Sequence, residues 1–324
     1  MKISQIILPT IFGMKTVNSF VIQGGDEVVL IDSGEDTDAS YDAMVAGLAE
    51  QDLLLSDIDR IIITHSHVDH IGMAQRVAEA ANAKVWVSEK TEAYAVDPTG
   101  QWGIRRNMIM STIMSFFPTA MHEYVETNYM SFAVKMKDVW KPIDTSIIEV
   151  FESEGSLEFC GEKWDTIYMP GHSSSQSTFY HESTGSYLAA DMLLKIASTP
   201  VIEPSLTDPD VRIKGILKMM ESYNRLSNYR LETVYPGHYD IFKDGNRMID
   251  NHKHRIHQRT EQCLAIIKSK SPDPISFLDL FQELYKGRWN FPALVMQIGY
   301  LDLLEDQDKV TYVEDEGFKR IVAV

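Results

Sequence analysis

The chain has 324 residues, of which 44% are hydrophobic and 24% charged, which fits a globular protein and disfavours disordered, fibrous and membrane classes. Lys and Arg total 30 and Asp and Glu total 47, so the formal net charge of −17 disfavours nucleic acid as the main partner. The length exceeds that of a usual single domain, so we expect one large domain and a small appendage.

Apolar residues alternate between strand-like and helix-like spacing along the first two-thirds of the chain. Strict alternation or a short apolar run indicates a strand, whereas apolar residues three and four apart indicate a helix. This succession predicts an α/β fold. The expected elements are strands at 17–22 and 28–31, a helix within 40–54, a strand at 61–63, a helix at 71–83, a strand at 84–87, helices within 103–139, strands within 147–190 and a helix at 211–226.

The segment 103–139 interrupts this alternation with many Met and aromatic residues. Methionine adapts its shape to varied apolar surfaces. The segment can therefore form an additional helical layer with its own core, or a lid over an apolar substrate. Both interpretations stay open. The residues concerned are Met108, Met110, Met114, Phe116, Phe117, Met121, Tyr124, Tyr129, Met130 and Phe132.

The C-terminal part has its own pattern. After about Asp244 the chain is helical, and Ser271-Pro272-Asp273-Pro274 interrupts the helix. We expect a main domain at 1–245 with a helical insertion at 103–139, and a winged-helix-like module at 246–324. The role of this module stays open: it can contact DNA, form a dimer contact or form a wall of a substrate pocket. The module's expected elements are helices at 277–285 and 293–304 and strands at 309–313 and 319–322.

The two cysteines, Cys160 and Cys263, lie far apart and lack metal-ligand spacing. We interpret them as buried apolar residues in a reducing compartment, and the sequence leaves a disulfide open. The apolar run at 3–8 is too short for a signal peptide, and no run reaches membrane-spanning length. We therefore expect a cytoplasmic protein without a membrane partner.

Three histidines and one aspartate follow the apolar run at 61–63. Residues two apart in an extended segment face the same way, so His65 and His67 can reach one cation together. Asp69 and His70 come where the chain turns into the next helix, so they can face a second cation. Because polar groups that are buried without partners are costly, the cluster predicts a two-metal site.

This cluster resembles the H-x-H-x-D-H signature of the metallo-beta-lactamase superfamily. The similarity covers about 1–245 and includes further segments in the same order. These are Val17-Asn18-Ser19-Phe20, Ile31-Asp32-Ser33-Gly34, Pro170-Gly171-His172-Ser173, Tyr187-Leu188-Ala189-Ala190-Asp191 and Pro236-Gly237-His238.

The resemblance implies an αββα sandwich of two mixed β-sheets flanked by helices. It also implies that Asp191 bridges two metals, that His65, His67 and His172 bind the first, and that Asp69, His70 and His238 bind the second. Imidazole and carboxylate ligands suit zinc, our first choice, and also accept iron or manganese. We interpret Asp32 as a turn residue or as a carboxylate that orients a ligating histidine.

Two adjacent cations lower the pKa of a bridging water and polarise a carbonyl or phosphoryl oxygen. A Ser or Cys nucleophile is then unnecessary, and Asp69 is the residue expected to orient the water or move a proton. The sequence therefore predicts a metal-dependent hydrolase. The five other histidines are interpreted as surface or structural residues; they are His122, His181, His252, His254 and His257.

The form Thr-His-Ser-His-Val-Asp-His resembles glyoxalase II-like thioesterases and acyl-homoserine-lactone hydrolases. It implies hydrolysis of an ester, thioester or lactone in a small-molecule substrate with an apolar acyl group. Whether the protein forms a homodimer stays open. The alternatives are a phosphodiesterase or ribonuclease, which the acidic balance opposes, and a non-catalytic regulatory protein that binds a metal or ligand. The lack of an export signal disfavours a beta-lactamase, and His67 disfavours a flavo-diiron oxidoreductase, which has glutamate there.

Overall fold

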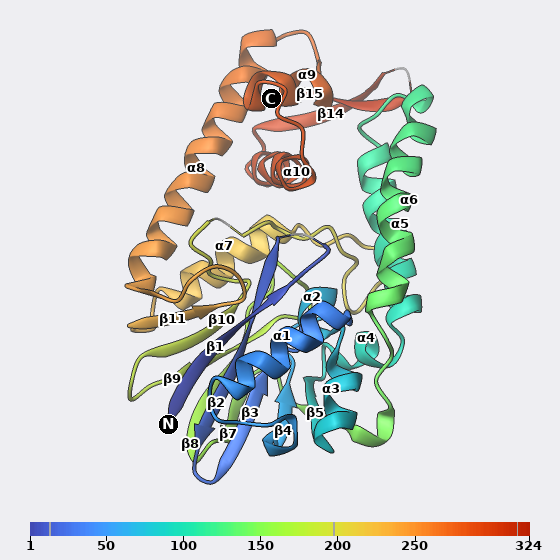
Figure 1. Cartoon of the computed structure of the whole chain (residues 1–324). Coiled ribbons are helices and arrows are strands. Elements are labelled where there is room, and N and C mark those ends of the chain that lie inside the picture. Colours follow the sequence, from blue (N-terminus) through green and yellow to red (C-terminus); the bar gives the residue numbers. More distant parts are fainter. Residues whose placement is uncertain (13, 197, 316) are drawn as a thin grey trace.

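The computed structural model describes residues 1–12, 14–196, 198–315 and 317–324, without the side chains at 128–135 and 137. Two six-stranded sheets pack face to face, helices cover their outer faces, and a three-stranded sheet lies near the C-terminus (Figure 1). The predicted αββα sandwich is therefore confirmed.

The first sheet joins an antiparallel meander to three parallel strands. β1, β2 and β3 pair antiparallel, and β4, β5 and β6 continue in parallel. Gly25 and Asp26 both have positive φ, as a two-residue hairpin turn requires. The strands, in sheet order, are β1 (Lys2–Pro9), β2 (Thr16–Gly24), β3 (Glu27–Ile31), β4 (Arg60–Ile62), β5 (Lys84–Ser88) and β6 (Ile148–Phe151).

The second sheet is antiparallel except for one parallel pair, β10 with β11. Its strands follow the sheet order β12-β11-β10-β9-β8-β7. They are β7 (Gly155–Phe159), β8 (Glu162–Tyr168), β9 (Ser177–His181), β10 (Ser186–Ala190), β11 (Thr233–Pro236) and β12 (Phe242–Lys243).

Alternate residues of the strands face different cores. Ile31 and Ile62 belong to the cluster between the two sheets, where Trp164 and Phe179 of the second sheet meet them. Neighbouring residues such as Leu30 belong instead to the cluster beneath the helices of the first sheet. Both faces of the central strands are therefore buried, as expected of parallel strands in an α/β fold.

Helices cover the outer face of each sheet. Met44 of α1 and Val77 of α3 pack on the first sheet, whereas Met219 of α7 and Ile256 of α8 pack on the second. The bounds are α1 (Asp38–Ala49), α2 (Val68–Ile71), α3 (Ala74–Ala81), α4 (Glu92–Val96), α7 (Gly215–Leu226) and α8 (Gly245–Lys270), with 3-10 turns η1 (Leu55–Asp57), η2 (Thr119–Met121) and η3 (Thr145–Ile147).

The insertion forms two helices, α5 (Pro98–Met114) and α6 (His122–Val139). α5 begins before the predicted residue 103, because Pro98 suits a first helical position and the Asp97 side chain accepts a 2.9 Å hydrogen bond from Gly100 N. Beyond α5, the Phe116 ring lies 5.1 Å from that of Phe277 in the C-terminal part. Three of the predicted apolar residues, Tyr129, Met130 and Phe132, lie outside the described side chains.

The C-terminal part has the predicted order of two helices and two strands, preceded by a two-residue strand without a periodic signal. One apolar cluster contains both Val234 of the second sheet and Leu301 of this part, so the core is continuous across residue 245. The division into two domains stays a prediction. The elements are β13 (Ile275–Ser276), α9 (Phe277–Tyr285), α10 (Phe291–Asp306), β14 (Val310–Asp315) and β15 (Phe318–Ala323), in the sheet order β13-β15-β14.

The helix predicted at 211–226 is wrong at its start. Residues 211–214 are extended: Arg212 forms a bridge with Pro204, and Ile213 N donates a 3.0 Å hydrogen bond to Glu203 O. Pairing with residues 203–205 therefore overrides the apolar spacing, and α7 begins at Gly215. Below, the extended segment means residues 203–213, whose two ends pair antiparallel across the bends and turn at 206–211.

Cys160 and Cys263 are buried and free. Within the described part of the chain, no helix has both the length and the apolarity that crossing a bilayer requires.

An ion pair ties the extended segment to α10. Two Arg212 guanidinium nitrogens lie 2.8 Å and 2.6 Å from the carboxylate oxygens of Asp302, which is 3% exposed. Asp302→Ala should lower the free energy of unfolding by about 3 kcal/mol, because it leaves a partly buried guanidinium without its partner. Urea denaturation measures this change. Asp240→Ala is the control, since its pair with Lys195 is exposed and should contribute less than about 1 kcal/mol. Equal effects of the two substitutions would contradict a structural role for the Arg212 pair.

Candidate metal centre

The seven predicted ligands lie just beyond strand ends of both sheets or on the short helix α2, which follows β4 in the chain. His65 and His67 follow β4, and Asp69 and His70 lie on α2. The remaining three follow strands of the second sheet, where His172 comes after β8, Asp191 after β10 and His238 after β11.

These side chains form three overlapping sets in which the ligand atoms lie within 4.8 Å of one another. The sets share His65 and His70, so all seven residues form one continuous cluster. The first and third sets have the composition that the resemblance implied, and Asp191 lies between them. The sets are His65, His67 and His172; His65, His70 and Asp191; and Asp69, His70 and His238.

A strand irregularity directs Asp191 into the cluster. The pairing of β10 with β11 shifts register between Leu188 and Ala190, and Ala190 has a φ of 45°. Such an irregularity re-aims the side chain that follows it. Asp191 Oδ2 consequently lies 3.3 Å from His172 Nε2 and 3.2 Å from His238 Nε2.

Two tight turns bring backbone close to the cluster. Gly171 has a φ of 142°, and a Cβ there would lie 2.6 Å from Met219 Cα. A Cβ at Gly237 would overlap Asp191 Oδ1 and lie 2.8 Å from His70 Cε1. Both positions therefore require glycine for space, and Gly171 also for its backbone conformation.

Four of the five histidines turn Nδ1 towards a protein oxygen and Nε2 towards the cluster. Such contacts fix ring orientation in metal sites. The contacts are His65 Nδ1 with Thr64 Oγ1 (3.0 Å), His70 Nδ1 with Asp32 Oδ2 (2.7 Å), His172 Nδ1 with Thr199 O (3.0 Å) and His238 Nδ1 with Thr16 O (2.6 Å).

His67 has the opposite orientation. Its Nδ1 lies 2.9 Å from His172 Nε2, whereas its Nε2 lies 2.7 Å from an Arg105 guanidinium nitrogen and 3.7 Å from Glu203 Oε1. Arg105 Nε is itself 3.1 Å from Glu203 Oε1. A buried ion pair from α5 and the extended segment therefore holds this ring.

Neither Arg105 nor Glu203 was identified from the sequence. Neither belongs to a motif, and they meet only because the extended segment passes α5. The one available signal was Glu203 itself, a lone carboxylate after the apolar residues Val201 and Ile202. Its side chain is fully buried and its second oxygen accepts a 2.7 Å hydrogen bond from Ser174 N.

Asp32 has both of the properties predicted for it. Its φ of 61° places it in a turn after β3. Its carboxylate also accepts 2.8 Å hydrogen bonds from Thr64 N and Thr64 Oγ1, besides its contact with His70. One buried carboxylate thus fixes the end of β4 and the orientation of a candidate ligand.

Three buried ligand atoms at the middle of the cluster have no hydrogen-bond partner in the described part of the chain: His65 Nε2, His70 Nε2 and Asp191 Oδ1. Leaving a buried polar atom unsatisfied costs roughly 1–3 kcal/mol. A bound cation would satisfy all three, and imidazole with carboxylate is a donor set that zinc, iron and manganese accept. The residues present therefore fit a divalent metal centre.

The histidines on one side of the cluster favour the neutral form. Burial lowers the pKa of His65 well below its usual value, and nearby histidine charges lower it further. Burial also lowers the pKa of His172 to about 3, although Asp191 opposes that effect. Neutral imidazole is the form that binds metals.

The other side of the cluster is dominated by carboxylates. Burial opposes the charged form of His70, but Asp32 and Asp191 outweigh it and raise the pKa of His70 to about 10. In turn, His70 and His238 overcome the effect of burial and hold the pKa of Asp69 well below its usual range. Asp69 is therefore a carboxylate at neutral pH.

The other histidines lie outside the three sets found among the described residues. His252 Nε2 is 2.8 Å from Leu194 O, and His181 Nδ1 is 2.8 Å from Thr184 Oγ1. His122 Nε2 lies within hydrogen-bonding distance of two backbone carbonyls. His254 and His257 are exposed on α8. These contacts agree with a surface or structural interpretation.

The sequence was compared with known proteins. The family model of the metallo-beta-lactamase superfamily matches residues 13–238. The chain is 26% identical over 313 residues to "Probable metallo-hydrolase YqjP" of Bacillus subtilis, covering 94% of this chain and 93% of the relative. It is 20% identical over 322 residues to "Beta-lactamase-like protein 2 homolog" of Drosophila melanogaster, covering 96% and 90%.

Solved structures show the same fold. The metallo-beta-lactamase family protein TTHA1429 of Thermus thermophilus superposes with a TM-score of 0.76 at 23% identity, covering 99% of this chain and 98% of that one. A beta-lactamase domain protein of Burkholderia ambifaria superposes with a TM-score of 0.78 at 16% identity, covering 99% and 91%. These matches include the C-terminal part. The chain therefore belongs to the metallo-beta-lactamase superfamily, as an enzyme of the metallo-hydrolase class.

Proposed function

We propose that this enzyme uses two divalent metal ions, zinc as first choice, to hydrolyse an ester, thioester or lactone bond of a small molecule. The observation that carries this proposal is the meeting of three buried ligand atoms that lack a hydrogen-bond partner, from His65, His70 and Asp191, within the cluster. Iron and manganese are the alternatives that the same donors accept.

In this proposal Asp191 would belong to the ligand sets of both metals. When bound, the two cations would supply Lewis acidity that lowers the pKa of water and polarises the substrate carbonyl. The ligands of the first metal are His65, His67 and His172, and those of the second are Asp69, His70 and His238.

Asp69 is the proposed catalytic residue of the chain. Its ionised carboxylate accepts a hydrogen bond from the attacking water and directs the water's lone pair towards the carbonyl carbon. Asp69 Oδ2 lies 3.3 Å from His238 Nε2, so its position is fixed by a neighbouring ligand. Because its pKa is low, orientation contributes more than proton abstraction.

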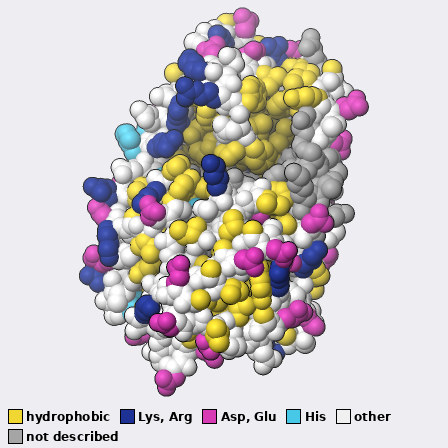
Figure 2. Space-filling model, in the orientation of Figure 1, with side chains coloured by type: hydrophobic (Ala, Val, Ile, Leu, Met, Phe, Trp, Pro, Cys, Tyr) yellow, Lys and Arg dark blue, Asp and Glu magenta, His cyan; other side chains and the backbone are white. Residues whose placement is uncertain are grey.

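An apolar acyl group in the substrate is supported by the surface beside α5. Figure 2 shows hydrophobic side chains gathered in a hollow in the upper half of the face drawn. Ile104, next to the Arg105 that contacts His67, is 39% exposed. The net charge of −17 opposes a nucleic-acid substrate. The free Cys160 and Cys263 are compatible with the reducing cytoplasm that we propose.

The first experiment is elemental analysis of the purified protein, followed by hydrolysis of thioesters, lactones and phosphodiesters with and without chelator. We expect close to two metals per chain and carbonyl hydrolysis that the chelator abolishes. A preference for phosphodiesters would favour the alternative phosphodiesterase. Absence of metal after reconstitution would overturn the metal centre, whereas bound metal without turnover of any substrate would favour a non-catalytic regulatory protein.

Asp191→Ala, and separately His67→Ala, should remove metal and turnover together, because each deletes a ligand from the cluster. Circular dichroism should show that most of the fold is retained, since the three apolar clusters are unchanged. His254→Ala is the matched control, an exposed histidine on α8 that should keep full metal content and activity. Full activity in a metal-depleted ligand variant would refute the mechanism.

Gly237→Ala should weaken metal binding without removing any ligand atom, because its Cβ would overlap Asp191 Oδ1. We expect at least a tenfold loss of metal affinity, in line with the roughly 10- to 100-fold losses seen when the support of a ligand is disturbed. A chelator competition titration measures it. Gly103→Ala is the control, since a Cβ there meets no atom within 4 Å. Equal affinities for both variants would show that this turn does not position Asp191.

A further inference from the structure

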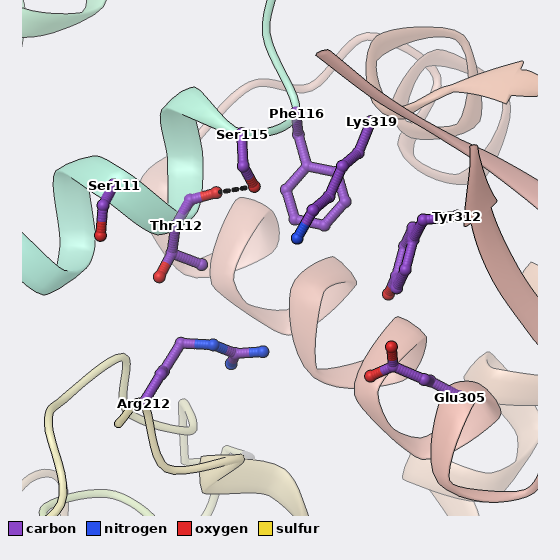
Figure 3. A pocket seen from close by; sticks show the side chains of 8 residues that line it. All are labelled: Ser111, Thr112, Ser115, Phe116, Arg212, Glu305, Tyr312 and Lys319. Carbon is purple, nitrogen blue, oxygen red and sulfur yellow. Dashed lines mark hydrogen bonds between the residues drawn. The ribbon is translucent and has the colours of Figure 1, made fainter. Parts of the chain in front are cut away.

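A second site, here called the second pocket, is separate from the metal cluster. It lies where the end of α5, the extended segment and the C-terminal part meet. Its volume is about 240 Å³. Figure 3 shows that Arg212, Lys319, Tyr312 and Glu305 extend their polar ends towards its centre, and that Thr112 of α5 lines another side. The Thr112 hydroxyl donates a 2.7 Å hydrogen bond to Met108 O. No residue of the metal cluster lines the second pocket.

The charges around this pocket leave one cation without a partner. Arg212 is paired with Asp302, and Glu305 Oε2 lies 2.7 Å from Lys214 Nζ. Lys319 Nζ has no carboxylate oxygen within 4.0 Å in the described part of the chain. The pocket therefore carries an excess positive charge within a chain of net charge −17.

Lys319 is directed into the pocket by its surroundings. Its ammonium lies 5.8 Å from the ring centre of Phe116 and 5.5 Å from that of Tyr312, which are cation–π distances. Its backbone N donates a 2.7 Å hydrogen bond to Ser115 O, so β15 is held against the end of α5. The ammonium therefore keeps its donors available for an anion.

Two elements connect this pocket to the metal centre. Residues seven apart lie on the same side of a helix, so Thr112 lies about 10 Å along α5 from Arg105, which contacts His67. The second connection is the extended segment. In it Arg212 lies opposite Pro204, and Pro204 directly follows Glu203, the other partner of His67.

We propose that this pocket binds a phosphate or carboxylate group of the substrate while the scissile carbonyl lies at the metal centre. Its volume is below the roughly 300–1,000 Å³ of pockets that hold whole small molecules, so it fits one end of a ligand. Lys319 supplies the charge, and the remaining guanidinium donors of Arg212 supply hydrogen bonds. The link to substrate rests on the proposed hydrolase function.

Binding is tested first with inorganic phosphate by isothermal titration. Phosphate can also bind at metals, so the titration uses the metal-loaded wild type and the Asp191→Ala protein, which should have lost its metal. We expect binding that persists in Asp191→Ala and weakens at least about tenfold when Lys319→Gln is added. Lys309→Gln, which removes a lysine paired with Glu261 in the same part of the chain, should leave it unchanged. Unchanged phosphate affinity in Lys319→Gln would overturn the proposal.

The second arm uses acyl esters that end in a carboxylate, a phosphate or a neutral methyl ester, in increasing chain length. Lys319→Gln should raise KM for the anionic esters about tenfold without changing kcat, and it should leave KM for the neutral esters unchanged. Lys319→Arg should restore KM for the anionic esters. The carboxylate and phosphate series identify the preferred group. An equal KM change for neutral esters would refute an anion site. If no ester is hydrolysed, the proposed function fails, and the phosphate titration still decides whether the pocket binds anions.

Discussion

The carboxylate of Asp32 is the contact on which the arrangement of the centre depends. It accepts hydrogen bonds from Thr64 N and Thr64 Oγ1 and contacts His70 Nδ1 at 2.7 Å. These groups belong to the end of β4 and to α2, so one buried side chain fixes the loop that carries His65 and His67. A carboxylate is needed because an amide at this point would present a donor as well as an acceptor.

The centre is built at the expense of local stability. Parallel strands β3, β4 and β5 end side by side, and their last apolar residues are followed directly by buried polar groups. Burying such groups without partners opposes folding. The apolar clusters on both faces of each sheet offset that cost, which is why ligands on loops can be held rigidly. Gly171 and Gly237 contribute in another way, since Gly171 lets its loop approach α7 and Gly237 lets the loop after β11 approach Asp191 and His70.

The site residues that could be predicted from spacing are those that lie close together in the sequence. His65, His67, Asp69 and His70 lie within six residues, so spacing alone indicated a shared cation. The other three ligands carry no such pattern and were predicted only through the resemblance, which supplied their order along the chain. The contacts of Arg105 and Glu203 with His67 could not be predicted, because they depend on where the insertion packs. The predicted start of the helix at 211 failed for the same reason, since a tertiary pairing replaced the local preference of Val211 and Ile213.

α5 and the extended segment, whose packing could not be predicted, set the environment in which a substrate would fit. In the proposed function the metal cluster accounts for bond cleavage, and it would act on any carbonyl that reaches it. α5 contacts His67 through Arg105 near its middle, and β15 holds its C-terminal end through Ser115 O and Lys319 N. The extended segment likewise runs from Glu203 to Arg212, which α10 holds through Asp302. A change in the C-terminal part can therefore alter both the shape of the second pocket and the support of a metal ligand. In the proposed function, selection among substrates and positioning of the centre would thus depend on one set of contacts, so residues far from His67 in the sequence are expected to influence both.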